Sequence, residues 1–389
     1  MYYIVVRQSP HYHQMSLEEF LFGDTDNLKP VLITNNETNT RTYALEKISD
    51  KFSRFIDVDA IIDKLTAFNK QTESLHEVDR HSLYREFYIP KKSGGLRRID
   101  APEPLLMNAL RTLKTIFEED CKCLYHTSAF AYIKRRSTLD AVKRHQANES
   151  RWFAKYDLSD FFGSTTKEFV MKMFGMIFPF CMIVQDSNGK EQLSKALDLA
   201  FLDGGLPQGT PISPIITNVM MIPVDYIVFN RFRNFKYQKD GKEISTNCVY
   251  TRYADDFLVS SRYDFDFRQA EQLIVDTLAS FDAPFTIKKQ KTRYGSSAGS
   301  NWNLGVMLNK DNNITIGYQR KKRFIAMISS YIMDRKNGVV WDKNDIQVME
   351  GYRNYYRMIE RDNIDGLIAH LSEKFNVDII AAIKEDLRA

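Results

Sequence analysis

The chain of 389 residues has few cysteines, no long apolar run and little net charge. Its four cysteines, Cys121, Cys123, Cys181 and Cys248, include one Cys-x-Cys pair with no second pair nearby, which excludes the usual spacing of a zinc site. We interpret them as reduced thiols. The longest apolar stretch, 173–184, is too short to cross a bilayer, and the N-terminal apolar run is too short for a signal peptide. These absences predict a cytoplasmic protein with no membrane partner.

The formal net charge is only +4, from 54 Lys and Arg residues against 50 Asp and Glu residues. Basic residues nevertheless gather in clusters at 91–98 (KKSGGLRR), 134–136, 288–291 and 320–323. Clusters of this kind in a nearly balanced chain are typical of a protein that follows a phosphate backbone along a groove. Each cluster alone is equally typical of a solvated surface, so the charge pattern needs support from chemistry elsewhere.

Segments with strand and helix patterns alternate along the chain, which predicts an α+β class. Residues 85–102 are typical of two strands joined by a Gly-Gly turn. Residues 249–261 (VYTRYADDFLVSS) form a second predicted hairpin, and 284–292 is a further predicted strand. From residue 318 onward the apolar residues recur with a helical period, which predicts a C-terminal helical bundle.

Three aspartates fall at the ends of these predicted strands. Asp157 ends the strand that begins near 152, and Asp255 and Asp256 lie on the turn of the second hairpin. Carboxylates brought this close repel one another and shift their pKa values unless cations lie between them. Magnesium prefers such oxygen ligands together with substrate phosphates, and two ions about 3.5–4 Å apart support in-line phosphoryl transfer. An Asp-Asp pair alone is more typical of an exposed turn than of a metal site, so the surrounding motifs decide between the two interpretations.

Those motifs occur in a fixed order. FAKYDLSDFF (153–162), LPQGTPISPIITN (206–218) and YADD (253–256) together resemble the palm of bacterial reverse transcriptases of the retron, group II intron and defence-associated lineages. IPKKSGGLRRIDAP (89–102) and AFAYIKRRSTLDAV (129–142) resemble the fingers motifs of that family. KKQKT resembles the strand after its catalytic hairpin, and NLGVML its primer grip.

The resemblance implies a right-hand polymerase fold with fingers, a palm whose antiparallel sheet is backed by helices, and a C-terminal helical thumb. The implied domains are an N-terminal extension (1–45), fingers (46–150), a palm (151–310) with a fingers-type insertion near 181–205, and a thumb (311–389).

The implied activity is that of an RNA-directed DNA polymerase, which adds dNTPs to a primer 3′ hydroxyl. The implied cofactors are two Mg²⁺ ions, for which Mn²⁺ is a substitute. The implied partners are an RNA template and the DNA product, with a cognate non-coding RNA as a further candidate. The sequence leaves the oligomeric state open.

The resemblance also assigns site residues. Asp157, Asp255 and Asp256 are the implied metal ligands, and Lys291 is the candidate general acid for pyrophosphate, with Lys288, Lys289 and Arg293 within reach. Residues implied to bind the nucleotide are Lys91, Arg97 (or its neighbour Arg98), Phe162, Gln208 and Gly209. Phe162 matches the position that excludes a sugar 2′ hydroxyl and so favours dNTPs. Residues implied to contact nucleic acid are Leu304, Gly305, Arg320, Lys321, Lys322 and Arg323.

Some segments depart from the family pattern. Ala129-Phe130-Ala131 replaces the usual Gly-Phe, the histidine of DAVKRH comes one residue late for the retron motif, and NLG stands where retron enzymes show Val-Thr-Gly. No maturase or endonuclease segment follows the predicted thumb. These departures favour an unclassified or defence-associated bacterial group.

Two other functions stay open at this point. One is template-independent or protein-primed DNA synthesis, for which any of the 20 tyrosines could supply the priming hydroxyl. The other is a catalytically silent nucleic-acid-binding scaffold, against which the three clustered carboxylates argue.

Overall fold

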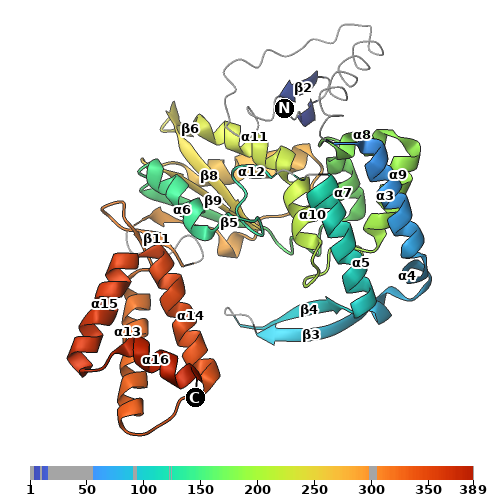
Figure 1. The fold of residues 1–389 in the computed structure, drawn as a ribbon. Helices are drawn as coiled ribbons and strands as arrows, with labels where there is room; N and C mark the ends of the chain where they lie inside the picture. Colours follow the sequence, from blue (N-terminus) through green and yellow to red (C-terminus); the bar gives the residue numbers. More distant parts are fainter. Residues whose placement is uncertain are drawn as a thin grey trace. The chain divides into compact units, whose positions relative to one another are not determined.

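The computed structural model describes residues 4–8, 11–15, 56–90, 94–121, 123, 125–297 and 305–388 (Figure 1). Most of the predicted N-terminal extension, together with Lys91 and Leu304, lies outside the described residues. The chain divides into two compact units. The first comprises Met1–Arg136, Lys155–Val259 and Asp266–Arg293, and the second Ser137–Ala154, Ser260–Phe265 and Tyr294–Ala389. The predicted boundaries of fingers, palm and thumb stay predictions.

A four-stranded sheet with the order β10-β5-β9-β8 carries the predicted catalytic segments. Its strands are β5 (Trp152–Asp157), β8 (Cys248–Tyr253), β9 (Asp256–Ser261) and β10 (Arg293–Ser296). A turn of only two residues joins β8 to β9, so these neighbours are antiparallel, as predicted. Most apolar residues of the hairpin are buried, with Val249 and Tyr253 half-buried, which is consistent with a sequence that is largely apolar on both sides of the turn.

Two-stranded hairpins lie before, between and after the strands of this sheet along the chain. The antiparallel pair β3 (Tyr84–Pro90) and β4 (Leu96–Pro102) places Ile89 opposite Arg97, which confirms the hairpin predicted over 85–102. Further antiparallel pairs are β6 (Phe235–Lys239) with β7 (Lys242–Thr246), β1 (Ile4–Gln8) with β2 (His11–Met15), and β11 (Met307–Leu308) with β12 (Ile314–Thr315).

The helices of the first unit supply most of its core. They are α3 (Val58–Gln71), α4 (Glu73–Glu77), α5 (Pro104–Thr115), α7 (Lys167–Phe174), α8 (Phe180–Gln185), α9 (Ser187–Asp198), α10 (Ser213–Met220), α11 (Ile222–Arg233) and α12 (Phe267–Ser280). Short helical turns occur at η1 (Arg80–Leu83), η2 (Ile116–Asp120) and η3 (Lys289–Lys291). Helix α3 packs against α9, and α11 packs against both β8 and α12 (Figure 1). Helices and antiparallel strands thus confirm the α+β class.

The second unit contains a helical bundle. Its elements are α6 (Thr138–Ala147), β11 (Met307–Leu308), β12 (Ile314–Thr315), α13 (Tyr318–Lys336), α14 (Lys343–Ile359), α15 (Arg361–Phe375) and α16 (Ile379–Arg388). The bundle buries one apolar cluster that includes Phe324, Ile328, Met349, Ile368 and Ile383. This packing confirms the helical bundle predicted from residue 318 onward. None of the helices in the described part of the chain is both long and apolar enough to span a bilayer.

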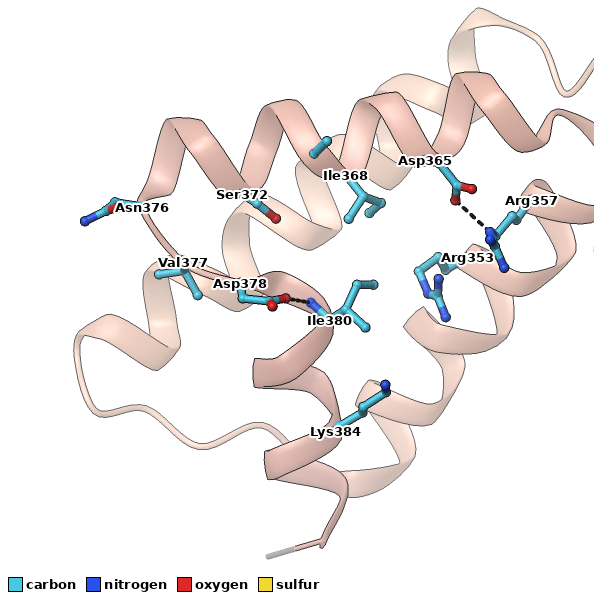
Figure 2. Close-up of a pocket in the computed structure, with 11 residues that line it drawn as sticks. Arg353, Arg357, Asp365, Ile368, Ser372, Asn376, Val377, Asp378, Ile380 and Lys384 are labelled. Atoms are coloured by element: carbon cyan, nitrogen blue, oxygen red, sulfur yellow. Dashed lines mark hydrogen bonds and ion pairs between the residues drawn. The ribbon is translucent and has the colours of Figure 1, made fainter.

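A pocket of about 850 Å³ opens among α14, α15 and α16 (Figure 2). Arg353, Arg357 and Lys384 line it together with Asp365. Arg357 donates from Nε to Asp365 at 2.6 Å, and both branches of Arg353 bind the carboxylate of Glu350 at 2.6 and 2.5 Å. Because carboxylates already neutralise both arginines, the pocket is not a strongly cationic surface.

Candidate active site

The turn between β8 and β9 is formed by Ala254 and Asp255. Ala254 has φ 57°, in the left-handed region that residues other than glycine seldom occupy. The backbone carbonyl of Asp255 accepts a hydrogen bond from the amide of Leu158 at 3.0 Å. Leu158 directly follows Asp157, so this bond joins the turn to the end of β5. The sheet thereby brings the three predicted carboxylates to one place.

The carboxylates influence one another electrostatically. Burial, followed by the charges of Asp256 and Asp157, raises the pKa of Asp255 to about 6. Burial also raises the pKa of Asp256, where the nearby Asp157 adds to the effect and Lys155 opposes it. The raised pKa values of Asp255 and Asp256 mean that a nearby positive charge would stabilise these two carboxylates in their ionised form.

Two lysines place a positive charge next to Asp157 and Asp256. Nζ of Lys291 lies 2.8 Å from both carboxylate oxygens of Asp157. Nζ of Lys155 lies 2.7 Å from Oδ2 of Asp256. Lys291 therefore lies beside the carboxylates, and its assignment as general acid stays a prediction. Lys155 was missed because a single lysine in a strand carries no distinctive signal.

The segment that carries Lys291 differs from its prediction. The predicted strand over 284–292 is wrong: only Ile287 forms a β-bridge, with Leu158, and Lys289–Lys291 form the 3₁₀ turn η3. The amide of Lys288 donates to the carbonyl of Asp157 at 2.8 Å, η3 then interrupts the extended chain beside the end of β5, and pairing with β5 resumes in β10. This turn is what allows the Lys291 side chain to point back to Asp157.

The donor set is compatible with a hard divalent cation. Oδ1 of Asp256 is buried and accepts no hydrogen bond from any described residue, so it is available as an oxygen ligand. As placed, however, the described His, Cys, Asp and Glu side chains include no group of three or more with the arrangement of a metal site. Magnesium commonly relies on one or two carboxylates and completes its shell with water and substrate phosphates. The assignment of Asp157, Asp255 and Asp256 as metal ligands stays a prediction.

The fingers hairpin separates the two candidate arginines. Arg97 and Arg98 are neighbours in β4, so their side chains point to opposite faces. Nε of Arg98 lies 2.7 Å from Asp100 and 3.0 Å from Glu86. Among the described residues no carboxylate pairs with Arg97, which is exposed. Arg97 is therefore the arginine that is available to bind a phosphate.

The charges of Asp255 and Arg97 both act on the phenol of Tyr132. Although Tyr132 is 58% exposed, partial desolvation and then the Asp255 carboxylate raise its pKa, and the charge of Arg97 opposes this effect. The ring of Tyr132 is 6.5 Å from that of Tyr253, the first residue of YADD.

The loop before α10 is attached to the fingers hairpin. The carbonyl of Gln208 accepts a hydrogen bond from the amide of Asp100 at 2.9 Å. Gly209 has φ 120°, and a Cβ there would lie 3.0 Å from the carbonyl oxygen of Asp100. A glycine is therefore required both by the backbone conformation and by the close approach of β4. This attachment holds Gln208 and Gly209 beside the strand that carries Arg97.

Phe162 follows β5 and is half-buried. Its ring packs edge-on against Phe161 with centroids 5.6 Å apart, and its carbonyl accepts a hydrogen bond from Leu206 at 2.9 Å. The backbone of Phe162 is thus fixed between the end of β5 and the loop that leads to Gln208. A rigid backbone at this point is what a side chain needs in order to act as a steric wall.

The candidate nucleic-acid contacts of the second unit differ in availability. A Cβ on Gly305 would lie 1.6 Å from Nη1 of Arg320, so the guanidinium of Arg320 packs directly on the Gly305 backbone. Lys321 pairs at 2.5 Å with Glu360, whose side chain is 7% exposed. Lys322 and Arg323 are exposed. Lys322 and Arg323 are thus more accessible than Lys321, and all of these residues stay predicted nucleic-acid contacts.

Sequence reasoning missed one conspicuous pair. Arg252 in β8 and Asp225 in α11 form an ion pair whose two side chains are 0% exposed. The signal was present, because each is a single charge within a strongly apolar segment, and such residues are almost never buried unless paired.

Comparison with known proteins shows the family of this chain. Residues 89–323 match the family described as reverse transcriptase (RNA-dependent DNA polymerase). The retron Ec83 reverse transcriptase of Escherichia coli is 26% identical over 320 residues, which cover 78% of this chain and 90% of that protein. The retron Ec73 reverse transcriptase of the same species is 27% identical over 286 residues, covering 71% of this chain and 83% of that protein.

Among solved structures, telomerase from Candida albicans with a fragment of telomeric RNA is similar at a TM-score of 0.43 and 12% identity, covering 77% of this chain and 54% of that chain. The family match spans more than half of the chain and includes the segments that carry all three aspartates. The chain therefore belongs to the reverse transcriptase family, with its α+β right-hand polymerase fold and its RNA-directed DNA polymerase activity.

Proposed function

We propose that this reverse transcriptase extends a primer 3′ hydroxyl with dNTPs on an RNA template, in the cytoplasm of a bacterium, as part of a retroelement or an anti-phage defence system. The observation that carries the proposal is the cluster of Asp157, Asp255 and Asp256 with Lys291 paired to Asp157. The similarity to two retron reverse transcriptases supports the retroelement context and a cognate non-coding RNA as partner.

Each residue has a defined part in the proposed reaction. The primer 3′ oxygen attacks the α-phosphorus, its bond to that phosphorus forms as the bond to pyrophosphate breaks, and the hydroxyl proton leaves to solvent. Lys291 donates a proton to the departing pyrophosphate. Arg97 binds the triphosphate as a bidentate donor, and Phe162 occupies the space that a ribose 2′ hydroxyl would need. Two Mg²⁺ ions, or Mn²⁺ in their place, held by the three aspartates would supply charge stabilisation at the attacking and leaving oxygens.

Primer extension by the purified protein tests this function. RNA template, DNA template and no template are compared with dNTPs and with NTPs, using Asp255→Asn/Asp256→Asn as the inactive variant. Asp282→Asn is the matched control, because Asp282 is an exposed aspartate paired with Lys172. We expect template-length DNA from RNA and dNTPs with the wild type and with Asp282→Asn only.

Other outcomes would redirect the proposal. Product without template, especially product attached to the protein, would replace it with template-independent or protein-primed synthesis. No product in the presence of co-purifying RNA would favour a nucleic-acid-binding scaffold. Sequencing that RNA identifies the cognate partner directly.

The biological role needs a separate measurement. Cells that express the wild type with its native flanking sequence are challenged with phage, alongside cells that express the double variant. Protection that requires Asp255 and Asp256 would support a defence role. Equal plaque counts in both strains across a phage panel would contradict it and leave the retroelement role.

A further inference from the structure

The catalytic hairpin contains a charged residue that the reaction does not use. Arg252 of β8 binds Asp225 of α11 through two parallel bonds, from Nε to Oδ1 at 2.8 Å and from Nη2 to Oδ2 at 2.8 Å. The hydroxyl of Tyr250 donates to the same Oδ1 at 2.7 Å. Both charged side chains are 0% exposed. The guanidinium is thus fixed in orientation as well as in charge.

A further branch of the guanidinium reaches the catalytic turn. Nη1 of Arg252 donates to the carbonyl of Ala254 at 3.1 Å. The next carbonyl, that of Asp255, is held by the amide of Leu158 at 3.0 Å. Both carbonyls of the turn are therefore fixed. A left-handed φ at an alanine persists only where surrounding contacts determine it, and these two bonds are such contacts.

The backbone of Arg252 also binds a third segment, residues 128–130. Its amide donates to the carbonyl of Ser128 at 2.6 Å, and its carbonyl accepts from the amide of Phe130 at 2.9 Å. Nδ2 of Asn218 in α10 holds the same segment through the carbonyl of Ala131 at 2.8 Å. Arg252 is accordingly the point where α11, the segment around Ala129 and the turn that carries Asp255 are joined.

Stability alone is a poor explanation for such a pair. Desolvation of two buried charges offsets much of their attraction, and apolar residues of similar volume often replace a buried ion pair without loss of stability. An apolar pair would fill the same space but could not hold the carbonyl of Ala254. In addition to its charge, the guanidinium holds the backbone carbonyl of Ala254, the residue before Asp255, in a fixed position.

We propose that the Asp225–Arg252 pair is a positioning device that fixes the Ala254–Asp255 turn and thereby the spacing of the three carboxylates. Neither residue touches the reacting atoms. The pair acts through the backbone of the turn, so it should affect the rate of the chemical step more than substrate binding. Misplacement of a reacting group by about 1 Å can reduce a rate about 100-fold.

The test replaces the pair by apolar residues, in the variant Asp225→Leu/Arg252→Met. We expect a folded protein whose melting temperature falls only by the effect of leaving the buried Tyr250 hydroxyl without its acceptor. We also expect a kcat for RNA-templated extension about 100-fold lower and a KM for dNTP that changes little. The matched control is Ser260→Ala in β9, which disrupts a buried network with His145 and Ser150 without touching the turn. That control should lower the melting temperature and keep kcat.

A folded double variant with the kcat of the wild type would overturn the proposal. If the double variant does not fold, Arg252→Lys serves the same purpose: lysine can pair with Asp225 but lacks the planar fork that also reaches Ala254. A reduced kcat with preserved melting then supports the proposal, and an unchanged kcat contradicts it.

A readout without catalysis separates this inference from the proposed function. Binding of Mn²⁺ alone to each protein is measured by calorimetry. Weaker binding to the double variant than to the wild type supports the positioning role even if the wild type extends no primer. Equal binding, together with equal kcat where the wild type is active, would refute it.

Discussion

Lys291 and Asp157 are 134 residues apart in the sequence, yet Nζ of Lys291 lies 2.8 Å from each carboxylate oxygen of Asp157. The same turn binds Asp157 a second time, because the amide of Lys288 donates to its carbonyl at 2.8 Å. Side chain and backbone of one aspartate are thus fixed by one short segment. The ammonium group is held beside the carboxylates, where a leaving pyrophosphate would need a proton.

Substitution of Lys291 distinguishes proton donation from simple charge. An arginine at this position can keep the ion pair with Asp157, but its guanidinium does not release a proton in proteins. If Lys291 is the general acid, both Lys291→Gln and Lys291→Arg should lower the single-turnover rate about 100-fold or more. The control Lys289→Gln changes an exposed lysine of the same turn and should leave the rate within about twofold. An active Lys291→Arg enzyme would assign Lys291 an electrostatic role only.

The sequence was sufficient to predict that the three carboxylates meet, because they lie at the ends of predicted strands and the flanking motifs resemble those of a known family. It was insufficient for the path of the chain near Lys291. The alternation in PFTIKKQKT is typical of a strand, but only Ile287 finds a partner, and the backbone of Lys288 binds Asp157 instead. Hydrogen bonds to a strand end that is distant in the sequence decide this conformation, and the local residue pattern cannot predict such bonds.

For the same reason, the sequence does not show that Asp225 and Arg252 pair with each other. A single charge in an apolar segment signals a buried partner, but the partner is 27 residues away on another element, and only the packing of α11 on β8 brings the two together. The division of the chain into two units is likewise a product of long-range packing, which composition and period do not encode.

Phe162 should control the choice between deoxyribose and ribose. The backbone of Phe162 is fixed through Leu206, so replacing the ring by a methyl group should open space without moving the chain. We expect Phe162→Ala to raise the ratio of rNTP to dNTP incorporation by about tenfold or more, measured as relative kcat/KM. Phe161→Leu changes the neighbouring buried ring and should leave the ratio nearly unchanged. An unaltered ratio in Phe162→Ala would assign sugar discrimination to another residue.

The thumb cations should differ in the salt dependence of nucleic-acid binding. Lys322 and Arg323 are exposed, whereas Lys321 is engaged by Glu360. If Lys322 and Arg323 contact phosphates, then Lys322→Gln and Arg323→Gln should each reduce the slope of log K against log salt concentration by about 1. Lys321→Gln should instead lower the melting temperature and leave the slope unchanged. Fluorescence anisotropy with an RNA–DNA duplex across a salt series measures these slopes, and a reduced slope in Lys321→Gln would contradict the structural role.

Asp255 should make the protein without divalent cations less stable as the pH rises. Its pKa is raised from 3.8 to about 6 in the folded protein, chiefly by burial and then by Asp256. The folded state therefore holds this proton more tightly than the unfolded state. The stabilising contribution is complete below about pH 4 and is lost as the pH rises through about 6.

Removal of the charge should restore that loss. We expect Asp255→Asn to increase the free energy of unfolding by about 2–3 kcal/mol at pH 8, and by about half as much at pH 5, in the presence of a chelator. Asp282→Asn is the control, because Asp282 is exposed and Lys172 lowers its pKa, so its loss should not stabilise the protein at pH 8. Denaturant unfolding at both pH values measures the difference.

Added Mg²⁺ should then stabilise the wild type at pH 8 more than Asp255→Asn, because the cation neutralises the same repulsion that the substitution removes. An equal response of both proteins to Mg²⁺ would argue against Asp255 as a ligand, whatever its effect on stability.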